Sequence, residues 1–390
     1  MDKKPKRMVP EVRFKGFTDD WEQRKLGELV TSYDTKRMPI RSEERMAGPY
    51  PYYGATGIID YVNNYIFDGK YLLLAEDGAN IIDRTAPITY LTNGKFWLNN
   101  HAHIMNSTKS NLVFLKATLD RKNYIKFNTG TAQPKLNAKI VANLKLNLPV
   151  LAEQDKISKV ISRIEIMIAL QQRKLEQLRL LKRAMLQQLF VNNTESLTPN
   201  IRFNNFSKDW EQRKGKFIFK SKSVKGYPNL PVLSATQDKG MILRDKSGID
   251  IKFNKKALSN YKKIEPGDFI VHLRSFQGGF AYSDIEGIAS PAYTVFSFID
   301  SKEFNDYFWK EKFCSYNFIQ LLKKVTYGVR DGRSINYSDF LTLPEKYPLL
   351  EEQNKIGNIL KKIDNLLSIQ QIRAKKLNFL KKFLLQKLFI

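Results

Sequence analysis

The stretch PEVRFKGFTDDWEQRK (residues 10–25) recurs later in the chain as PNIRFNNFSKDWEQRK (residues 199–214). The pentapeptide WEQRK is identical in both copies, and its tryptophans, Trp21 and Trp210, are 189 residues apart. A second pair of segments begins PVLAEQDKI at residue 149 and PLLEEQNKI at residue 348, which are 199 residues apart. Self-similarity at a long, nearly constant spacing indicates copies of one structural unit. The sequence therefore predicts two modules, each of roughly 190 to 200 residues.

The middle of each module diverges, since PYYGATG (51–57) matches PVLSATQ (231–237) only loosely. Variable segments held on a constant scaffold are typical of recognition proteins. Short apolar or alternating runs bounded by turn residues predict β-strands in this part, so each module begins with a mixed domain. The clearest of these runs are YLLLA (71–75), FIVHL (269–273) and YTVFSF (293–298).

The last part of each module reads as one long helix, because no proline occurs from Leu151 to Phe190 or from Leu349 to Phe389. About 40 residues at 1.5 Å each would form a rod of roughly 60 Å. Apolar heptads predict an antiparallel coiled coil with a polar layer at its centre. The alternative is that each helix is simply core within its own module. One predicted seam register holds Ile157, Ile164, Gln171, Leu178, Ile356, Ile363, Gln370 and Leu377; the other holds Val160, Met167, Leu181, Ile359, Leu366 and Leu380.

The predicted fold is therefore α+β: two globular mixed α/β domains separated by two long helices, with a pseudo-two-fold internal repeat. We expect a first domain over residues 1–150 and a first helix with its linker over 151–195. The second domain and second helix are then expected over 196–348 and 349–390.

Charge points to a polyanionic partner. The 390 residues include 65 Lys and Arg against 39 Asp and Glu, a net charge of +26, and the basic excess is spread over the whole length. That distribution favours a long positive surface that follows a nucleic-acid backbone. The single cysteine, Cys314, excludes a disulfide framework and a multi-thiolate metal site. No apolar run reaches the roughly 18 residues of a membrane span and no signal-peptide core is present, so we expect a soluble, cytoplasmic protein without a membrane partner.

Catalytic motifs are missing from the sequence. It contains no GxxxxGK[ST] loop for ATP, no GxGxxG for a nucleotide or methyl donor, and no Asn-Pro-Pro-aromatic element. The histidines are His101, His103 and His272, and hydrogen bonding in a polar strand explains the first two better than a metal site does. We therefore expect no catalytic residue, no metal and no cofactor of its own: a binding protein and not an enzyme.

The chain resembles, over essentially its whole length, the specificity subunit of Type I restriction–modification systems. The resemblance rests on RFxxFxxDWEQRK at Arg13–Lys25 and Arg202–Lys214, on YPYYGATGIIDYVNNYIFDGKYLLLAEDGAN (50–80), and on the two helix starts at 149–157 and 348–356. It implies two target-recognition domains, each reading half of an asymmetric bipartite DNA site, and helices that set the spacer. It also implies two methyltransferase subunits that bring S-adenosylmethionine and methylate adenine, and a restriction subunit that brings ATP-driven translocation and cleavage.

Residues that contact DNA are expected on loops that reach the major groove, with Arg or Lys for guanine and phosphate, and Asn or Gln for adenine. In the first domain the candidates are Lys36, Arg37, Arg41 and Arg45 in a basic loop, and Thr131, Gln133 and Lys135 in GTAQPKLN (130–137). In the second domain they are Arg274, Gln277, Arg330, Arg333 and Ser334. Two other classes stay open at this point: a stand-alone nucleic-acid-binding scaffold without a methylase partner, and a fused enzyme, which length and the missing motifs disfavour.

Overall fold

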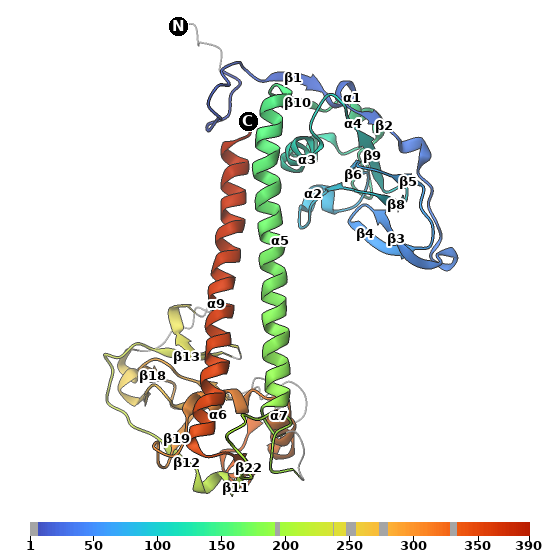
Figure 1. The fold of residues 1–390 in the computed structure, drawn as a ribbon. Coiled ribbons are helices and arrows are strands. Elements are labelled where there is room, and N and C mark those ends of the chain that lie inside the picture. The colour runs from blue at the N-terminus through green and yellow to red at the C-terminus, as the bar shows by residue number, and fades with distance from the viewer. Residues whose placement is uncertain (1–6, 192–195, 237, 247–254, 273–279, 328–333) are drawn as a thin grey trace. The chain divides into compact units, whose positions relative to one another are not determined.

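The computed structural model describes residues 7–191, 196–236, 238–246, 255–272, 280–327 and 334–390. The chain divides into two compact units. The first unit combines Met1–Gln172 with Arg373–Ile390, and the second is Arg173–Ile372. Each unit thus contains one mixed domain together with part of each long helix (Figure 1).

The two long helices are α5 (Leu151–Gln188) and α9 (Leu350–Lys387), each of 38 residues, and both predicted helices are confirmed. Both begin in the same way. The Gln154 side chain donates to the Pro149 carbonyl at 2.9 Å, and the Gln353 side chain donates to the Pro348 carbonyl at 2.9 Å. The glutamine shared by AEQDK and EEQNK therefore anchors each helix to the proline two residues before its start.

The first domain is built on an antiparallel sheet in the order β2-β9-β6-β7. Its inner strand β6 is buried along its whole length, as the apolar run YLLLA predicts. A second four-stranded sheet, β4-β3-β8-β5, and the pair β1-β10 complete the strands of this domain in the described residues. The elements are β1 (Glu22–Lys25), α1 (Leu26–Leu29), β2 (Thr31–Ser32), η1 (Asp34–Lys36), η2 (Ser42–Glu44), β3 (Ala47–Gly54), β4 (Gly57–Val62), β5 (Phe67–Asp68), β6 (Leu72–Ala75), α2 (Asn80–Asp83), β7 (Thr89–Leu91), β8 (Lys95–Leu98), β9 (Ala102–Asn106), α3 (Leu112–Arg121), η3 (Ile125–Phe127), α4 (Ala138–Ala142) and β10 (Lys145–Leu148).

The second domain repeats the main sheet in the order β12-β19-β16-β17, and its strands β11 and β22 pair as β1 and β10 do. Each of these strand pairs lies directly before the start of a long helix, and we call this part of each unit the joint. Where the first domain has a second four-stranded sheet, the described part of this domain has the separate pairs β13-β14 and β15-β18. The elements are β11 (Glu211–Lys214), η4 (Gly215–Phe217), β12 (Phe219–Lys222), β13 (Leu233–Thr236), β14 (Gly240–Leu243), η5 (Arg244–Lys246), η6 (Lys255–Asn260), β15 (Lys262–Ile264), β16 (Phe269–Val271), β17 (Ala281–Tyr282), β18 (Gly287–Ala289), β19 (Thr294–Phe298), α6 (Asp306–Phe313), α7 (Tyr316–Leu322), η7 (Lys323–Val325), β20 (Thr326–Tyr327), β21 (Ser334–Ile335), α8 (Tyr337–Phe340) and β22 (Pro344–Tyr347).

The core of each unit includes the leucine and phenylalanine that directly follow one long helix. In the first unit the Phe389 ring lies 5.0 Å from Phe114 and 6.4 Å from Trp21, measured between ring centroids. In the second unit Phe190 lies 5.2 Å from Phe308, which is 5.9 Å from Trp210. Buried aromatic pairs of this kind contribute more to stability than the apolar area that they bury would by itself. The repeated Leu-Phe at the helix ends is therefore core of a mixed domain.

Within each unit the two helix segments run antiparallel. In the first unit Lys381 of α9 donates to Glu165 of α5 at 2.7 Å, while Ile157 and Leu388 share one buried cluster, so a later α9 residue meets an earlier α5 residue. In the second unit Lys182 donates to Asp364 at 2.6 Å, and Leu189 shares a cluster with Ile356. The antiparallel pairing predicted from the heptads is confirmed.

One predicted register of the seam is displaced by a residue. Ile157 and Ile164 are buried as expected, as are Ile356, Ile363 and Gln370, while Gln171, Leu178 and Leu377 are half-buried. The second buried register, however, runs through Ile161, Leu175 and Leu360. After each residue of the first register, the second register can use the residue either three or four positions later. Apolar residues occupy both of these positions in much of the two helices. Four predicted seam residues lie at the surface instead: Met167, Leu181, Leu366 and Leu380, which are 52%, 48%, 45% and 42% exposed.

Candidate nucleic-acid interface

Two loops of the first domain meet where strand β6 ends and strand β9 begins. The first is the basic loop, residues 34–45, which contains η1 and η2. The second is the glycine loop, which we define as residues 128–137. Leu136 of this loop donates its backbone N–H to the Glu76 carbonyl at 2.7 Å, and Gly78 donates to Pro134 at 3.0 Å. The glycine loop is therefore fixed to this end of the sheet.

Arg37 attaches the basic loop to the sheet. Its guanidinium donates to Glu76 at 2.6 Å and to the carbonyls of Ala102 and Asp34, each at 2.9 Å, and only 13% of its side chain is exposed. Arg45 is also engaged, since its guanidinium lies 4.6 Å from the centre of the Tyr52 ring. Arg37 and Arg45 therefore hold the basic loop in its conformation. Lys36 and Arg41 are the two predicted basic residues that the loop displays to solvent.

The glycine loop presents polar side chains from a rigid turn. The Asn128 side chain accepts from the backbone N–H groups of Gly130 at 2.9 Å and Lys135 at 2.8 Å. A Cβ at Gly130 would lie 1.7 Å from the Gln133 carbonyl oxygen, so only glycine fits this turn. Thr131, Gln133 and Lys135 are all exposed at its surface. The structure thus brings the seven predicted DNA contacts of the first domain onto two adjoining loops.

Acidic and histidine side chains beneath the loops join them. Glu76 accepts from Arg37 and also pairs with Lys135 at 3.3 Å. Asp34 is hydrogen-bonded to His103 at 2.6 Å. Burial raises the pKa of Asp34, but the hydrogen bond and charge of His103, together with Arg37, outweigh burial and hold that pKa below its usual value. Sequence reasoning missed Asp34, Glu76 and Asn128; the polar histidine inside the buried strand AHIMN was the available signal.

In the second domain Arg274, Gln277, Arg330 and Arg333 lie outside the described residues. Ser334 begins strand β21, which pairs with β20. The described edge of the equivalent sheet carries His272, where burial lowers the histidine pKa. A buried histidine that favours its neutral form thus lies at this edge of the second domain.

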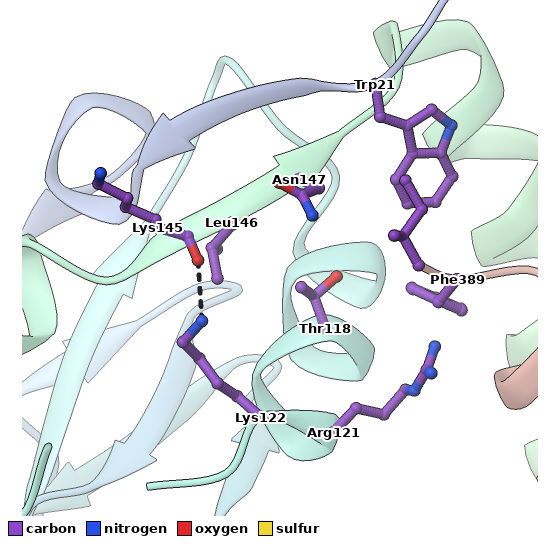
Figure 2. Close-up of a pocket in the computed structure, with 9 residues that line it drawn as sticks. Trp21, Thr118, Arg121, Lys122, Lys145, Leu146, Asn147 and Phe389 are labelled. Atoms are coloured by element: carbon purple, nitrogen blue, oxygen red, sulfur yellow. Dashed lines mark hydrogen bonds between the residues drawn. The ribbon is translucent and has the colours of Figure 1, made fainter. Parts of the chain in front are cut away.

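A cationic pocket of about 180 Å³ lies at the joint of the first unit, formed by Trp21, Phe389 and three basic residues. Arg121 lies over the Phe389 ring at 5.1 Å, and Lys122 donates to the Lys145 carbonyl at 2.9 Å (Figure 2). Burial lowers the pKa of both Arg121 and Lys122. Positive charge is thus present at the joint as well as on the loops.

The described ranges contain no group of three or more His, Cys, Asp or Glu side chains arranged to hold a metal ion. His101 and His103 are instead hydrogen-bonded to Asp77 and Asp34. Every helix in the part of the chain that the structure describes is too short or too polar to cross a bilayer.

Comparison with known families matches this chain to the Type I restriction modification DNA specificity domain over residues 18–180 and again over 208–378. The chain belongs to this family. The two matches correspond to the two mixed domains with their helices, so the internal repeat is a repeat of the family's own domain.

Individual relatives carry the same description. A type I restriction enzyme specificity subunit of Methanocaldococcus jannaschii is 24% identical over 93% of this chain and 91% of that protein. A putative one from Haemophilus influenzae is 34% identical over 159 residues, and the match covers 40% of each protein. The crystal structure of a Type-I restriction-modification system S subunit from M. genitalium matches 98% of this chain and 99% of that one, with a TM-score of 0.68 at 14% identity. At that identity the likeness is one of fold.

Proposed function

We propose that this chain is the DNA-recognition subunit of a type I restriction–modification complex, and that each mixed domain reads one half of a bipartite DNA site. The observation that carries the proposal is a repeated sheet and joint with different loops at the sheet end. In the first domain that end presents Lys36, Arg41, Thr131, Gln133 and Lys135. Lysine and arginine suit phosphates and guanine, and glutamine suits adenine. Different loops on one scaffold give an asymmetric site.

The helices support a second part of the proposal, the docking of two methyltransferase subunits. Each unit exposes an apolar patch on its helix segments, and the seam leaves these side chains uncovered. In the first unit the patch comprises Ile166, Met167, Leu170, Phe379, Leu380 and Phe383; in the second it comprises Leu180, Leu181, Leu366, Ile369 and Ile372. Contiguous exposed apolar surface is typical of a protein interface.

The two patches correspond through the 199-residue repeat, which pairs Met167 with Leu366 and Leu170 with Ile369. Equivalent surfaces suit two copies of one partner. In this proposal the partners supply S-adenosylmethionine chemistry on a flipped adenine, and a restriction subunit supplies ATP-driven cleavage. This chain supplies the sequence-specific binding to cytoplasmic DNA, and it has no catalytic step and no cofactor of its own.

Domain replacement tests the reading of half-sites. Residues 200–348 are exchanged for the corresponding domain of another family member, and methylated motifs are sequenced in cells that carry either version with the methyltransferase. We expect one half of the methylated motif to change and the other half to stay. A change in both halves would contradict independent reading. A control exchange of Gln172→Ser, on the exposed helix surface, should leave the motif intact.

Paired helix variants test docking. Leu170→Asp places a charge in the patch of the first unit, and Ile369→Asp does the same in the second. We expect each variant to lose one methyltransferase copy and the double variant to lose both, as counted by native mass spectrometry. Two bound copies in the double variant would show that the patches are not the docking surfaces.

A further inference from the structure

His103 occupies an unusual position for a histidine, in the interior of the first sheet. It lies on β9 and is 2% exposed. Its Nδ1 lies 2.6 Å from a carboxylate oxygen of Asp34, and its Nε2 lies 2.7 Å from the carbonyl oxygen of Leu136. Asp34 opens the basic loop and Leu136 belongs to the glycine loop. One buried ring therefore bonds to both loops.

The hydrogen-bond chemistry fixes the charge of this ring. A carboxylate and a carbonyl are both acceptors, while a neutral imidazole has one N–H donor and an imidazolium has two. Only the imidazolium can donate to Asp34 and Leu136 together. Leaving one buried acceptor unpaired would be destabilising. The hydrogen bond that Asp34 also accepts from the Ile104 backbone, at 2.9 Å, keeps the carboxylate facing the ring.

The equivalent position of the second domain holds a different residue. β9 pairs with β2 through Met105 and Ser32, and β19 pairs with β12 through Phe296 and Ser221; the two serines are 189 residues apart, as the WEQRK segments are. Aligning the two sheets on these pairs places Thr294, which is half-buried, at the position of His103. The second sheet therefore forms with a threonine at this position, so the strand pairing does not require a histidine there.

We propose that His103, as an imidazolium, is a positioning residue that holds the basic loop and the glycine loop in the arrangement that reads the first half-site. The inference rests on the proposed function of those loops. It adds a specific prediction: the protonation of one buried side chain controls selectivity at one half-site and leaves the other half-site alone.

The groups around His103 are of both signs. Asp34 and Arg37 face it from the basic loop, and Glu76 lies 3.8 Å from Nδ1 at the end of β6. Lys135 lies on the glycine loop and pairs with Glu76, while the exposed His101 pairs with Asp77 at 2.8 Å. His101 is the matched control, because it is a histidine at the same sheet edge whose side chain is 51% exposed.

The test uses the full chain with its methyltransferase and duplexes that carry the bipartite site defined by methylated-motif sequencing. His103→Val should keep the unfolding temperature near that of the wild type, because Thr294, which has the shape of valine, occupies the equivalent position of the second sheet, and should weaken binding about tenfold. His103→Gln restores one donor and should recover part of that loss. His101→Val should bind as the wild type does. On a duplex whose first half-site is scrambled, all four proteins should bind alike.

Protonation is measured directly on the free protein by ¹⁵N NMR, in which both ring nitrogens of His103 should carry a proton at neutral pH. A single ring N–H, or a loss by His103→Val that is equal on intact and scrambled duplexes, would overturn the inference. If no bipartite motif exists for the wild type, the proposed function fails instead, and the NMR result still decides the charge.

Discussion

The two units attach their mixed domains to the long helices in the same way, but they differ in the charge of their interiors. In the first unit the Arg13 guanidinium donates two hydrogen bonds to Glu153, and in the second Arg202 donates two to Glu352, all four at 2.8 Å. Asn111 bonds to Gln154 and Asp155, and Asn305 bonds to Gln353 and Asn354, in the same pattern. These contacts tie each domain to the start of its helix. The strongest sequence repeat therefore marks the joint, where geometry must be the same in both copies.

Away from that joint the interiors differ in charge. The first unit has a cluster of Lys116, Glu165 and Lys381, and the second has the equivalent Lys310, Asp364 and Lys182. The second adds a buried carboxylate, Glu311, which pairs with Lys182 at 3.0 Å. It also buries a Lys312–Glu345 ion pair, where the repeat places Thr118 and Leu146 in the first unit. This difference shows that the fold requires the same contacts between domain and helix in both units, and that other interior positions can hold either charged or apolar side chains.

The largest expected effect concerns the shared joint. Arg13→Ala and Arg202→Ala each leave a buried glutamate without its partner, which typically costs about 3–5 kcal/mol. Because the two pairs have the same geometry, we expect equal losses in the free energy of unfolding, each in its own unit. Hydrogen exchange resolved by segment measures both. Arg7→Ala, which removes an exposed pair with Asp20, is the control and should cost less than about 1 kcal/mol. Unequal losses would break the equivalence of the joints.

The second prediction concerns the buried Lys312–Glu345 ion pair of the second unit, which is replaced by apolar residues. Lys312→Met alone leaves Glu345 buried and unpaired, and should destabilise the second unit by about 3–5 kcal/mol. Adding Glu345→Leu gives the residue found in the first unit at that position, so the double variant should return to within about 1 kcal/mol of the wild type or exceed it. Chemical denaturation of both variants decides this. A double variant as unstable as Lys312→Met would show that the second unit depends on its ion pair.

The third prediction uses pH, because Glu311 of the second unit and Glu165 of the first respond to pH with opposite signs. Burial raises the pKa of Glu311, so its ionised form destabilises the second unit and that penalty shrinks as pH falls from neutral through the raised pKa. Burial also acts to raise the pKa of Glu165, but hydrogen bonds and charges from Lys381 and Lys116 outweigh it and lower that pKa. Its stabilisation is therefore present at neutral pH and lost as pH falls through the lowered pKa.

The corresponding measurement compares Glu311→Gln and Glu165→Gln with the wild type by hydrogen exchange across the acid range. Wild type should gain stability relative to Glu311→Gln as the pH falls from 7 toward about 5. It should lose its advantage over Glu165→Gln only below about pH 4. Parallel pH curves for the two variants would contradict the difference between the clusters.

The smallest expected effect on stability belongs to the loops that distinguish the domains. Thr131→Ala and Gln133→Ala alter exposed side chains and should change the free energy of unfolding by less than about 0.5 kcal/mol. A side chain among them that reads a base edge should nevertheless lose about 1–3 kcal/mol of binding to the first half-site. Binding to scrambled first half-sites is the control. A uniform loss across all sequences would reassign the residue to a phosphate contact.

The sequence alone determined the repeat, the two long helices and the main strands. These features depend on local rules: the absence of proline, heptad spacing, and apolar runs bounded by turn residues. It also located the basic loop and the glycine loop, because charge and glycine spacing are visible without a structure. Lys36, Arg41 and Gln133 needed no further information to be named as candidates.

Tertiary structure decided what each side chain does. Arg37 and Lys36 are neighbours in the sequence, but Arg37 is held by Glu76, a contact across the sheet that no local pattern reveals. Likewise, Val160 and Ile161 fit the helix pattern equally well, and only packing against α9 selected Ile161 for the seam and left Met167 at the surface. Burial and pairing depend on residues far apart in the chain, and that is why His103 became visible as a link between the loops only once its two acceptors were in place.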